Sequence, residues 1–163
     1  MTQEEAILKT LAYHDIFDYP LTKEEIYKYL IEKKASLQTI SNQIQKLKSQ
    51  RQIGKEQALG PQSRSAGREP QGTVYFFLKN QSRIVGIRKI RQRCSYAKLK
   101  KALFYSQLLK SIPTIRLVGI TGALAMDNSK KSDDIDLMVI CAKNTLWTTR
   151  LLANLLLLPF KRD

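Results

Sequence analysis

Hydrophobic residues recur at near-helical intervals in three stretches of the first fifty residues, and this pattern predicts three short helices. Each stretch opens on a residue that caps helices well. Thr2 and Thr22 are each followed three residues later by a glutamate, the spacing of a capping box, and Ser36 precedes the third stretch. Asp-Tyr-Pro at 18–20 separates the first two helices, because proline cannot continue a helix. The apolar positions expected to face a core are Ile7, Leu8, Leu11, Ile16, Ile26, Tyr29, Leu30, Leu37, Ile40, Ile44 and Leu47.

Two short strands are predicted after the third helix, at residues 52–55 and 73–78. The second (TVYFFL) is the stronger prediction, because it is rich in β-branched and aromatic residues. The loop between the strands contains three glycines and two prolines, and it carries Arg64 and Arg68. We therefore expect three helices followed by a hairpin in the first half of the chain.

This order of elements resembles a winged-helix domain, a variant of the helix-turn-helix, over residues 1–80. The resemblance implies that the third helix contacts a groove of a nucleic acid, with Lys46 and Arg51 available for phosphates. Winged helices also serve as protein-contact modules. Residues 1–32 carry seven acidic and three basic side chains, which duplex DNA would repel. Both interpretations stay open on the sequence alone.

Positive charge is concentrated in the middle of the chain. The protein has 28 Lys and Arg against 14 Asp and Glu, a formal net charge of +14, and residues 33–126 hold nineteen of these bases and two of the acids. An excess of this size attracts polyanions such as DNA or RNA. A solvated helix surface chosen for solubility would have the same composition, so this alternative is kept.

Residues 81–112 are predicted to form a basic helical connector, continuous or broken near Gly86. The segment contains nine Lys and Arg and no acid, and Lys100 and Lys101 are the candidate nucleic-acid contacts. A cationic helix could also lie on anionic lipid, although a helix between two folded modules normally buries its apolar side against them. The apolar positions expected to form one buried stripe are Ile84, Ile87, Ile90, Leu99, Leu103 and Leu109.

The composition excludes several other classes of protein. The chain of 163 residues is 43% hydrophobic, which is too apolar for a disordered tail. Cys94 and Cys141 stand far apart with no second Cys or His near either, so a zinc site or a disulfide framework is not expected. The acidic, amphipathic start does not resemble a signal peptide, and the apolar run at 151–160 has about half the length needed to span a bilayer. We expect a soluble, cytoplasmic protein with no membrane segment.

The candidate chemistry lies in residues 115–142. Two strands are predicted there, IRLVGI at 115–120 and DIDLMVI at 134–140, separated by a turn at Thr121-Gly122, a short helix and a polar loop. Alternate residues of a strand face the same side, so Asp134 and Asp136 should project together. Two adjacent carboxylates repel each other unless a cation neutralises them, and oxygen-only ligands favour Mg²⁺. We predict Asp134 and Asp136 as metal ligands.

The same stretch resembles the nucleotidyltransferase superfamily that includes DNA polymerase beta and the small bacterial nucleotidyltransferases. The family pattern is a hydrophobic residue, Gly, then Gly or Ser, a spacer of about ten residues, and Asp-hydrophobic-Asp-hydrophobic. This chain has Thr121-Gly122-Ala123, a ten-residue spacer and Asp134-Ile135-Asp136-Leu137. The resemblance implies that Asp134 and Asp136 are the catalytic and magnesium-binding carboxylates. It also implies that Gly122 and Ala123 approach the phosphates of an NTP, whose nucleotidyl group passes to a hydroxyl acceptor while pyrophosphate leaves.

Three departures from the family pattern lower the expected activity. Ala123 stands where the family has Ser or Gly, and it has no hydroxyl for a phosphate oxygen. The family adds a third carboxylate from a later strand, whereas the only acid after Asp136 is Asp163. Only two strands are predicted in this half, and the apolar helix at 146–158 has nothing after it to pack on. We expect weak or absent catalysis unless further chain or a protein partner completes this domain.

Together these patterns predict an α+β protein with three parts: a winged-helix-like domain at 1–80, the basic connector at 81–112, and a partial nucleotidyltransferase-like α/β domain at 113–163. The alternative function is a non-enzymatic nucleic-acid-binding or regulatory winged-helix protein. A third possibility is a module whose apolar C-terminal helix docks on a protein partner.

Overall fold

The computed structural model describes residues 1–57 and 72–160, and the predicted loop arginines Arg64 and Arg68 lie outside them. The α+β class is confirmed: the described residues contain helices and two separate two-stranded antiparallel sheets. The chain divides into two compact units, residues 1–90 and 91–163, with the division inside helix α4. None of the helices in the described ranges is long and apolar enough to cross a membrane.

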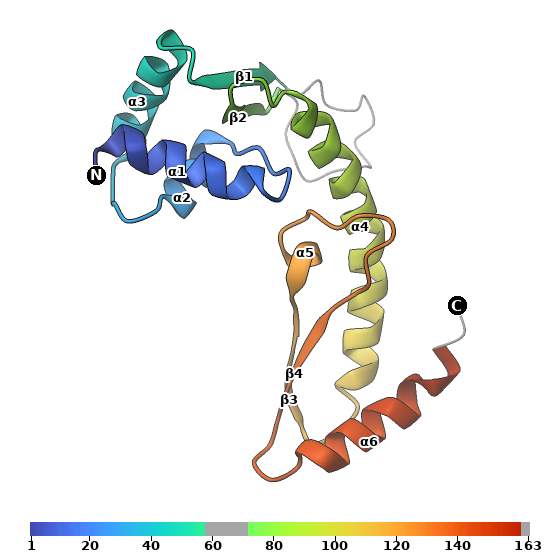
Figure 1. Cartoon of the computed structure of the whole chain (residues 1–163). Helices are drawn as coiled ribbons and strands as arrows, with labels where there is room; N and C mark the ends of the chain where they lie inside the picture. Colours follow the sequence, from blue (N-terminus) through green and yellow to red (C-terminus); the bar gives the residue numbers. More distant parts are fainter. Residues whose placement is uncertain (58–71, 161–163) are drawn as a thin grey trace. The chain divides into compact units, whose positions relative to one another are not determined.

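The first unit has the predicted order of three helices and a hairpin (Figure 1). Its elements are α1 (Gln3–Asp15), α2 (Lys23–Tyr29), α3 (Leu37–Ser49), β1 (Ile53–Gln57) and β2 (Val74–Leu78). The two strands pair antiparallel, from Ile53 opposite Leu78 to Gln57 opposite Val74. Leu21 adds an antiparallel bridge to Phe76, through backbone bonds of 3.0 and 2.7 Å. The segment between α1 and α2 is thereby attached to the hairpin.

The three predicted helix starts are all formed. The Thr2 hydroxyl accepts the backbone N–H of Glu5 at 3.2 Å, and the Glu5 carboxylate accepts the backbone N–H of Thr2 at 2.8 Å. Thr22 and Glu25 make the same reciprocal pair before α2, and the Ser36 hydroxyl accepts a backbone N–H at the start of α3. Such caps satisfy amides that have no partner within the helix, each contributing about 0.5–2 kcal/mol.

The core of the first unit is built from the apolar faces of its three helices together with the hairpin. Its buried members are Ile7, Leu11, Tyr19, Leu21, Ile26, Ile40, Ile44, Leu47, Ile53 and Phe76. Two residues predicted to face this core are exposed instead, Ile16 and Leu37. Ile16 is the C-cap residue directly after α1, and Leu37 is the first residue of α3, so each lies at a helix end and beyond the packed part of its face.

Helix α4 (Arg83–Leu109) is continuous through Gly86. The predicted apolar stripe is only partly right: Ile84 and Leu109 are buried, but Ile90 is 64% exposed and Leu103 is 52% exposed. Arg88 and Arg91 are buried instead. The inward side of this helix is therefore partly cationic, because the neighbouring segments offer polar acceptors to these side chains.

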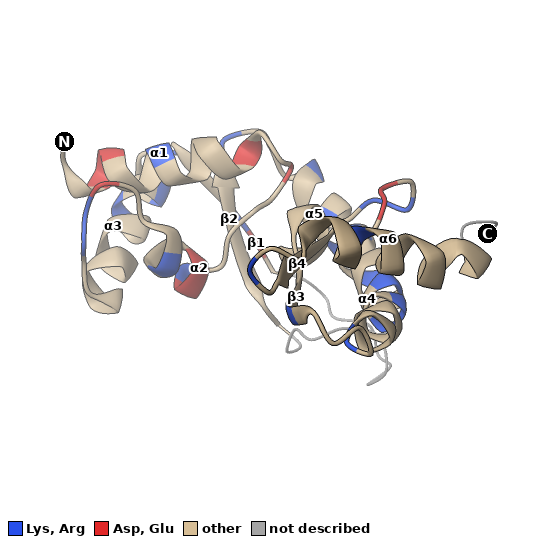
Figure 2. Ribbon diagram, turned by 90° about the horizontal axis from the view of Figure 1, so that it is seen from below, with Lys and Arg blue, Asp and Glu red and all other residues tan. Residues whose placement is uncertain are grey.

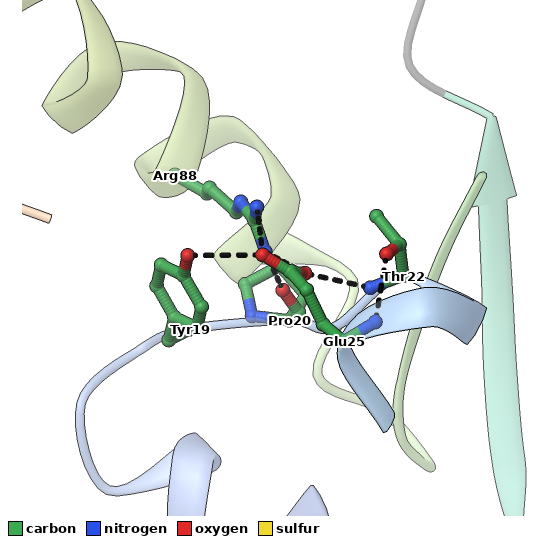
Figure 3. Close-up of polar contacts among 5 residues, drawn as sticks. All are labelled: Tyr19, Pro20, Thr22, Glu25 and Arg88. Carbon is green, nitrogen blue, oxygen red and sulfur yellow. Dashed lines mark hydrogen bonds and ion pairs between the residues drawn. The ribbon is translucent and has the colours of Figure 1, made fainter. Parts of the chain in front are cut away.

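A buried polar cluster around Arg88 fixes the beginning of α4 to the first unit (Figure 3). The Arg88 guanidinium donates to both carboxylate oxygens of Glu25, at 2.7 and 2.8 Å, and to the carbonyl of Pro20. It also lies 4.1 Å from the ring centre of Tyr19 and 4.7 Å from that of Tyr75. The Tyr19 hydroxyl donates to Glu25 at 3.2 Å. A bidentate pair stacked between aromatic rings is an arrangement that suits arginine and not lysine.

The ionisation of this cluster follows from its burial and its partners. Burial by itself raises the pKa of the Glu25 carboxyl, but the hydrogen bonds and charge of Arg88 outweigh it, with further hydrogen bonds from Thr22 and Tyr19. The pKa of Glu25 is therefore held below its ordinary value. Burial raises the pKa of the Tyr19 phenol, an effect that Arg88 opposes and Glu25 reinforces. Glu25 is thus kept ionised and Tyr19 is kept neutral near pH 7.

The second unit contains the residues that carry the candidate chemistry. Its elements after α4 are β3 (Ile115–Ile120), α5 (Gly122–Ala125), β4 (Leu137–Cys141), α6 (Leu146–Leu157) and a short 3₁₀ turn, η1 (Leu158–Phe160). Strands β3 and β4 are antiparallel, with Ile120 opposite Leu137 and a register shift near the other end. The second predicted strand, 134–140, is displaced: β4 begins at Leu137, so Asp134 and Asp136 precede the strand.

Candidate functional site

The structure places Asp136 directly beside Gly122. The end of β3 and the start of β4 lie opposite each other, and the Thr121 N–H donates to the carbonyl of Asp136 at 3.1 Å. Gly122 has a φ of +65°, a conformation that glycine adopts without strain. A Cβ atom at this position would lie 2.8 Å from Oδ2 of Asp136. The carboxylate thus occupies space that only a glycine leaves open.

Asp134 and Asp136 are both exposed, whereas Ile135 and Leu137 between and after them are half-buried. This alternation continues along β4, where Met138 is exposed again. The two carboxylates are therefore on the solvent side of the segment, as predicted from their spacing, although they stand before the strand and not within it. Gly122 and Ala123 are also exposed, so the backbone of the turn is accessible from solvent.

The carboxylate oxygens of Asp134 and Asp136 are ligands of the kind that a hard divalent cation such as Mg²⁺ prefers. Mg²⁺ is commonly bound by one or two carboxylates, with water and substrate phosphates completing its shell. Asp134 and Asp136 supply carboxylate oxygens on an exposed surface, and the Asp136 carboxylate lies beside the exposed backbone of the turn at Gly122. Within the described residues, no three His, Cys, Asp or Glu side chains are grouped so as to hold a metal.

A set of contacts that the sequence did not reveal anchors the loop before the two aspartates. Lys98 of α4 donates to the Ser129 hydroxyl at 3.0 Å and to the carbonyls of Lys130 and Asp133. The Ser129 N–H donates to the Ser95 hydroxyl at 2.9 Å. In the sequence Lys98 is one of nine bases in an acid-free segment. Its only distinguishing signal is that it follows Ser95 by three residues, on the same side of a helix.

The candidate nucleic-acid contacts of the first unit lie on or next to α3. The outward face of this helix is polar and free of acids; its exposed members are Gln38, Asn42, Gln45, Lys46 and Lys48. Lys46 forms an ion pair with Glu4 of α1 at 2.5 Å. Arg51 is exposed in the turn between α3 and β1. A phosphate would therefore compete with Glu4 for Lys46, whereas Arg51 forms no ion pair with another residue in the described part of the chain.

The candidate contacts of the second unit are exposed on α4, among the Lys and Arg residues that are blue in Figure 2. Lys101 points to solvent, and the ammonium of Lys100 lies 4.9 Å from the ring centre of Tyr96. Among the described acids of the first unit, which are red in Figure 2, five are on α1 or α2, three are in connecting segments or on β1, and none is on α3.

Comparison with known proteins gives no further guide, since no family model, no curated protein and no solved structure matches this chain.

Proposed function

We propose that the second unit contains the opening part of a nucleotidyltransferase-like domain, in which Asp134 and Asp136 bind Mg²⁺ together with the phosphates of an NTP. The observation that carries this proposal is the contact between Asp136 and Gly122. The two parts of the sequence motif are separated by a ten-residue spacer, yet Oδ2 of Asp136 lies only 2.8 Å from where a Cβ of residue 122 would be. This proximity supports a common role for the turn and the acidic pair.

The residues of the turn and of the acidic pair have separate tasks under this proposal. The bare backbone of Gly122 and the small side chain of Ala123 leave the exposed turn open to a phosphate oxygen. Asp134 and Asp136 hold the cation at the solvent side of the segment. Mg²⁺, when bound, neutralises the paired carboxylates and the negative charge of the triphosphate. The transfer itself takes the nucleotidyl group from the NTP to a hydroxyl acceptor, releasing pyrophosphate.

This chain is expected to bind nucleotide better than it transfers it. The described residues present two carboxylates at the turn and not three. The unit also leaves apolar residues uncovered on its sheet, where Leu117 and Ile140 are opposite each other with Met138 beside them. An uncovered apolar sheet face supports completion of the domain by further chain or by a protein partner.

Titration with each of the four NTPs in the presence of Mg²⁺ tests the proposal. We expect Asp136→Asn to weaken binding by roughly tenfold or more, because even the loss of a residue that only supports a metal ligand costs that much. Asp127→Asn is the matched control: it removes the same charge from the same unit, at a φ of +53° that asparagine tolerates. If the wild type and Asp136→Asn bind NTP with equal affinity in the presence of Mg²⁺, the proposal is wrong.

Catalysis is tested separately, with labelled NTPs, Mg²⁺ and a panel of hydroxyl acceptors. We expect weak or absent incorporation of label, because the described residues place no third carboxylate at the turn to help activate the acceptor. Robust incorporation that Asp136→Ala abolishes would show that the expectation of inactivity is wrong, while leaving the assignment of Asp136 intact.

A second function, nucleic-acid binding by the first unit as a winged helix together with the basic segment on α4, is favoured by one specific observation in the first unit. The outward face of α3 is acid-free and lined with amides and lysines, which is the composition of a helix that contacts a groove. The bridge from Leu21 to Phe76 and the order of the elements also support a winged helix.

Salt-dependent binding to DNA and RNA duplexes tests this second function. We expect affinity to fall as salt rises, and Lys100→Glu combined with Lys101→Glu to weaken binding and flatten the salt dependence. Asp134→Asn combined with Asp136→Asn is the control, which should retain binding. If Lys100→Glu combined with Lys101→Glu leaves the affinity unchanged, the basic segment does not contact the nucleic acid.

A further inference from the structure

Three residues on one side of α4 hold the loop that leads into the acidic pair. Arg91, Ser95 and Lys98 are spaced by four and three residues, so they share a helix face. Arg91 donates to the Asn128 side-chain oxygen at 3.3 Å, Ser95 accepts the N–H of Ser129, and Lys98 reaches the loop furthest along the chain. The loop is therefore tethered at successive points along its length.

Lys98 makes three hydrogen bonds to this loop. A lysine ammonium has three N–H donors. Three acceptors face it: the Ser129 hydroxyl and the carbonyls of Lys130 and Asp133. Ser95 and Ser129 are completely buried beside this contact. An ammonium with this set of partners is committed to the loop and is not a free contact for a polyanion.

The tether ends immediately before the candidate metal ligands. The carbonyl of Asp133 accepts from Lys98, and Asp134 is the next residue. On the other side, the carbonyl of Asp136 accepts from the Thr121 N–H at 3.1 Å. The segment that carries both carboxylates is thus fixed at each end, once by α4 and once by the turn at Gly122.

We propose that Lys98 is a positioning residue, which holds the segment 134–136 in the conformation that binds a divalent cation. This inference rests on the proposed function. Two effects of Lys98 on cation affinity have opposite signs. Its positive charge, held at the carbonyl of the residue before Asp134, disfavours a cation nearby, whereas its hydrogen bonds preorganise the ligands. Removal of the Lys98 side chain therefore distinguishes the two effects: cation binding weakens if positioning dominates and strengthens if charge repulsion dominates.

The test is Mn²⁺ binding to the full chain, followed by the electron paramagnetic resonance signal of the free ion. Mn²⁺ has the same preference for oxygen ligands as Mg²⁺. The variants are Lys98→Met, Ser95→Ala and Asp136→Asn. Lys110→Met is the matched control, because Lys110 is an exposed lysine of the same unit that makes no contact with the loop. Hydrogen exchange at residues 129–136 reports the order of the segment independently of the metal.

We expect Lys98→Met to weaken Mn²⁺ binding by roughly tenfold to a hundredfold, and exchange to rise at residues 129–136 while the rest of the unit stays protected. Ser95→Ala removes a contact with the loop without changing any charge, and it should also weaken Mn²⁺ binding. This variant tests the positioning role if Lys98→Met fails to fold. Lys110→Met should not weaken it. Affinity that stays equal or rises in both Lys98→Met and Ser95→Ala overturns the positioning role, while loss of binding in Asp136→Asn still supports the metal site. Absence of binding in the wild type overturns both.

Discussion

At the scale of single residues, Arg88 is the side chain on which the first unit depends most. Its side chain is 3% exposed and pairs with Glu25 at 2.7 Å. A buried ion pair of this kind contributes little compared with two well-packed apolar residues, but breaking it leaves one charge buried without its partner. The cost of a single substitution should therefore be large.

We predict that Arg88→Met lowers the free energy of unfolding by about 3–5 kcal/mol. Arg88→Lys should lower it as well, because a lysine cannot bond both carboxylate oxygens in the same plane. Urea denaturation measures both. Arg83→Met, an exposed arginine one turn and a half earlier on α4, should stay within about 0.5 kcal/mol of the wild type. A loss below about 1 kcal/mol in Arg88→Met would contradict the prediction.

The lowered pKa of Glu25 makes part of this stability depend on pH. The unfolded chain has a glutamate pKa of about 4.3, and the folded pKa is lower. Its contribution is therefore fully present above the unfolded value and is lost as the pH falls through the folded value. The stability difference between the wild type and the double variant Arg88→Met with Glu25→Gln should shrink as the pH falls below the unfolded glutamate pKa of about 4.3. Glu24→Gln, at an exposed neighbour, should leave the pH profile of the wild type unchanged.

At the scale of elements, the structure leaves room for a side chain at Gly86 but not at Gly122. Gly86 lies within α4, and a Cβ there would meet nothing within 4 Å. Gly122 has a positive φ and faces the Asp136 carboxylate. The continuity of α4 through Gly86 comes from the contacts on either side of it, such as Ile84, Val85 and Arg88, and not from the intrinsic preference of the residue.

We predict that Gly86→Ala raises the stability of the protein by roughly 0.4–1 kcal/mol, because alanine favours the helix and restricts the unfolded chain. Gly122→Ala should lower it by about 1–2 kcal/mol, the cost of a left-handed conformation for an L-residue. It should also displace Asp136 and weaken nucleotide binding. Thermal unfolding of the two variants side by side checks the signs, and a stabilising Gly122→Ala would be incompatible with the described turn.

At the scale of the whole molecule, the most unusual feature is the exposed apolar surface of α6. Trp147 is 74% exposed, and Leu151 and Leu155 of α6 and Leu158 at the start of η1 follow it at helical spacing, each more than half exposed. The opposite side of α6 contacts the segment before β3, where the hydroxyls of Thr149 and Thr114 form a hydrogen bond of 2.6 Å. Apolar patches of this kind mark interaction surfaces, which supports the proposal that a protein partner or further chain covers this unit.

We predict that Leu151→Gln combined with Leu155→Gln reduces the fluorescence of an apolar dye bound to the protein, with a change in stability within about 0.5 kcal/mol. The matched change at a buried position, Leu124→Gln, should instead destabilise the protein and increase dye binding, because a buried amide lacks partners. If the double variant binds dye as strongly as the wild type, the exposed face of α6 is not the apolar surface that the dye detects.

Local signals predicted most of the elements because their causes are local. The capping pairs at Thr2 and Thr22 form within four residues, and the strand at 115–120 is defined by its own apolar residues. The same reasoning placed the start of the next strand three residues too early. Asp134 and Asp136 alternate with apolar residues like strand residues, but the ladder with β3 begins only at Leu137.

The amino-acid sequence by itself determined the three capped helices, the individual apolar strands and the alternation of the acidic pair with apolar residues, because each depends on neighbours a few residues away. Only the tertiary structure decided which cations are buried: Arg88 faces Glu25 across 63 positions of chain, and Lys98 faces the loop at 129–133. It also decided that Asp136 lies against Gly122. Such contacts depend on how distant segments meet, and no local pattern of charge or hydrophobicity encodes that geometry.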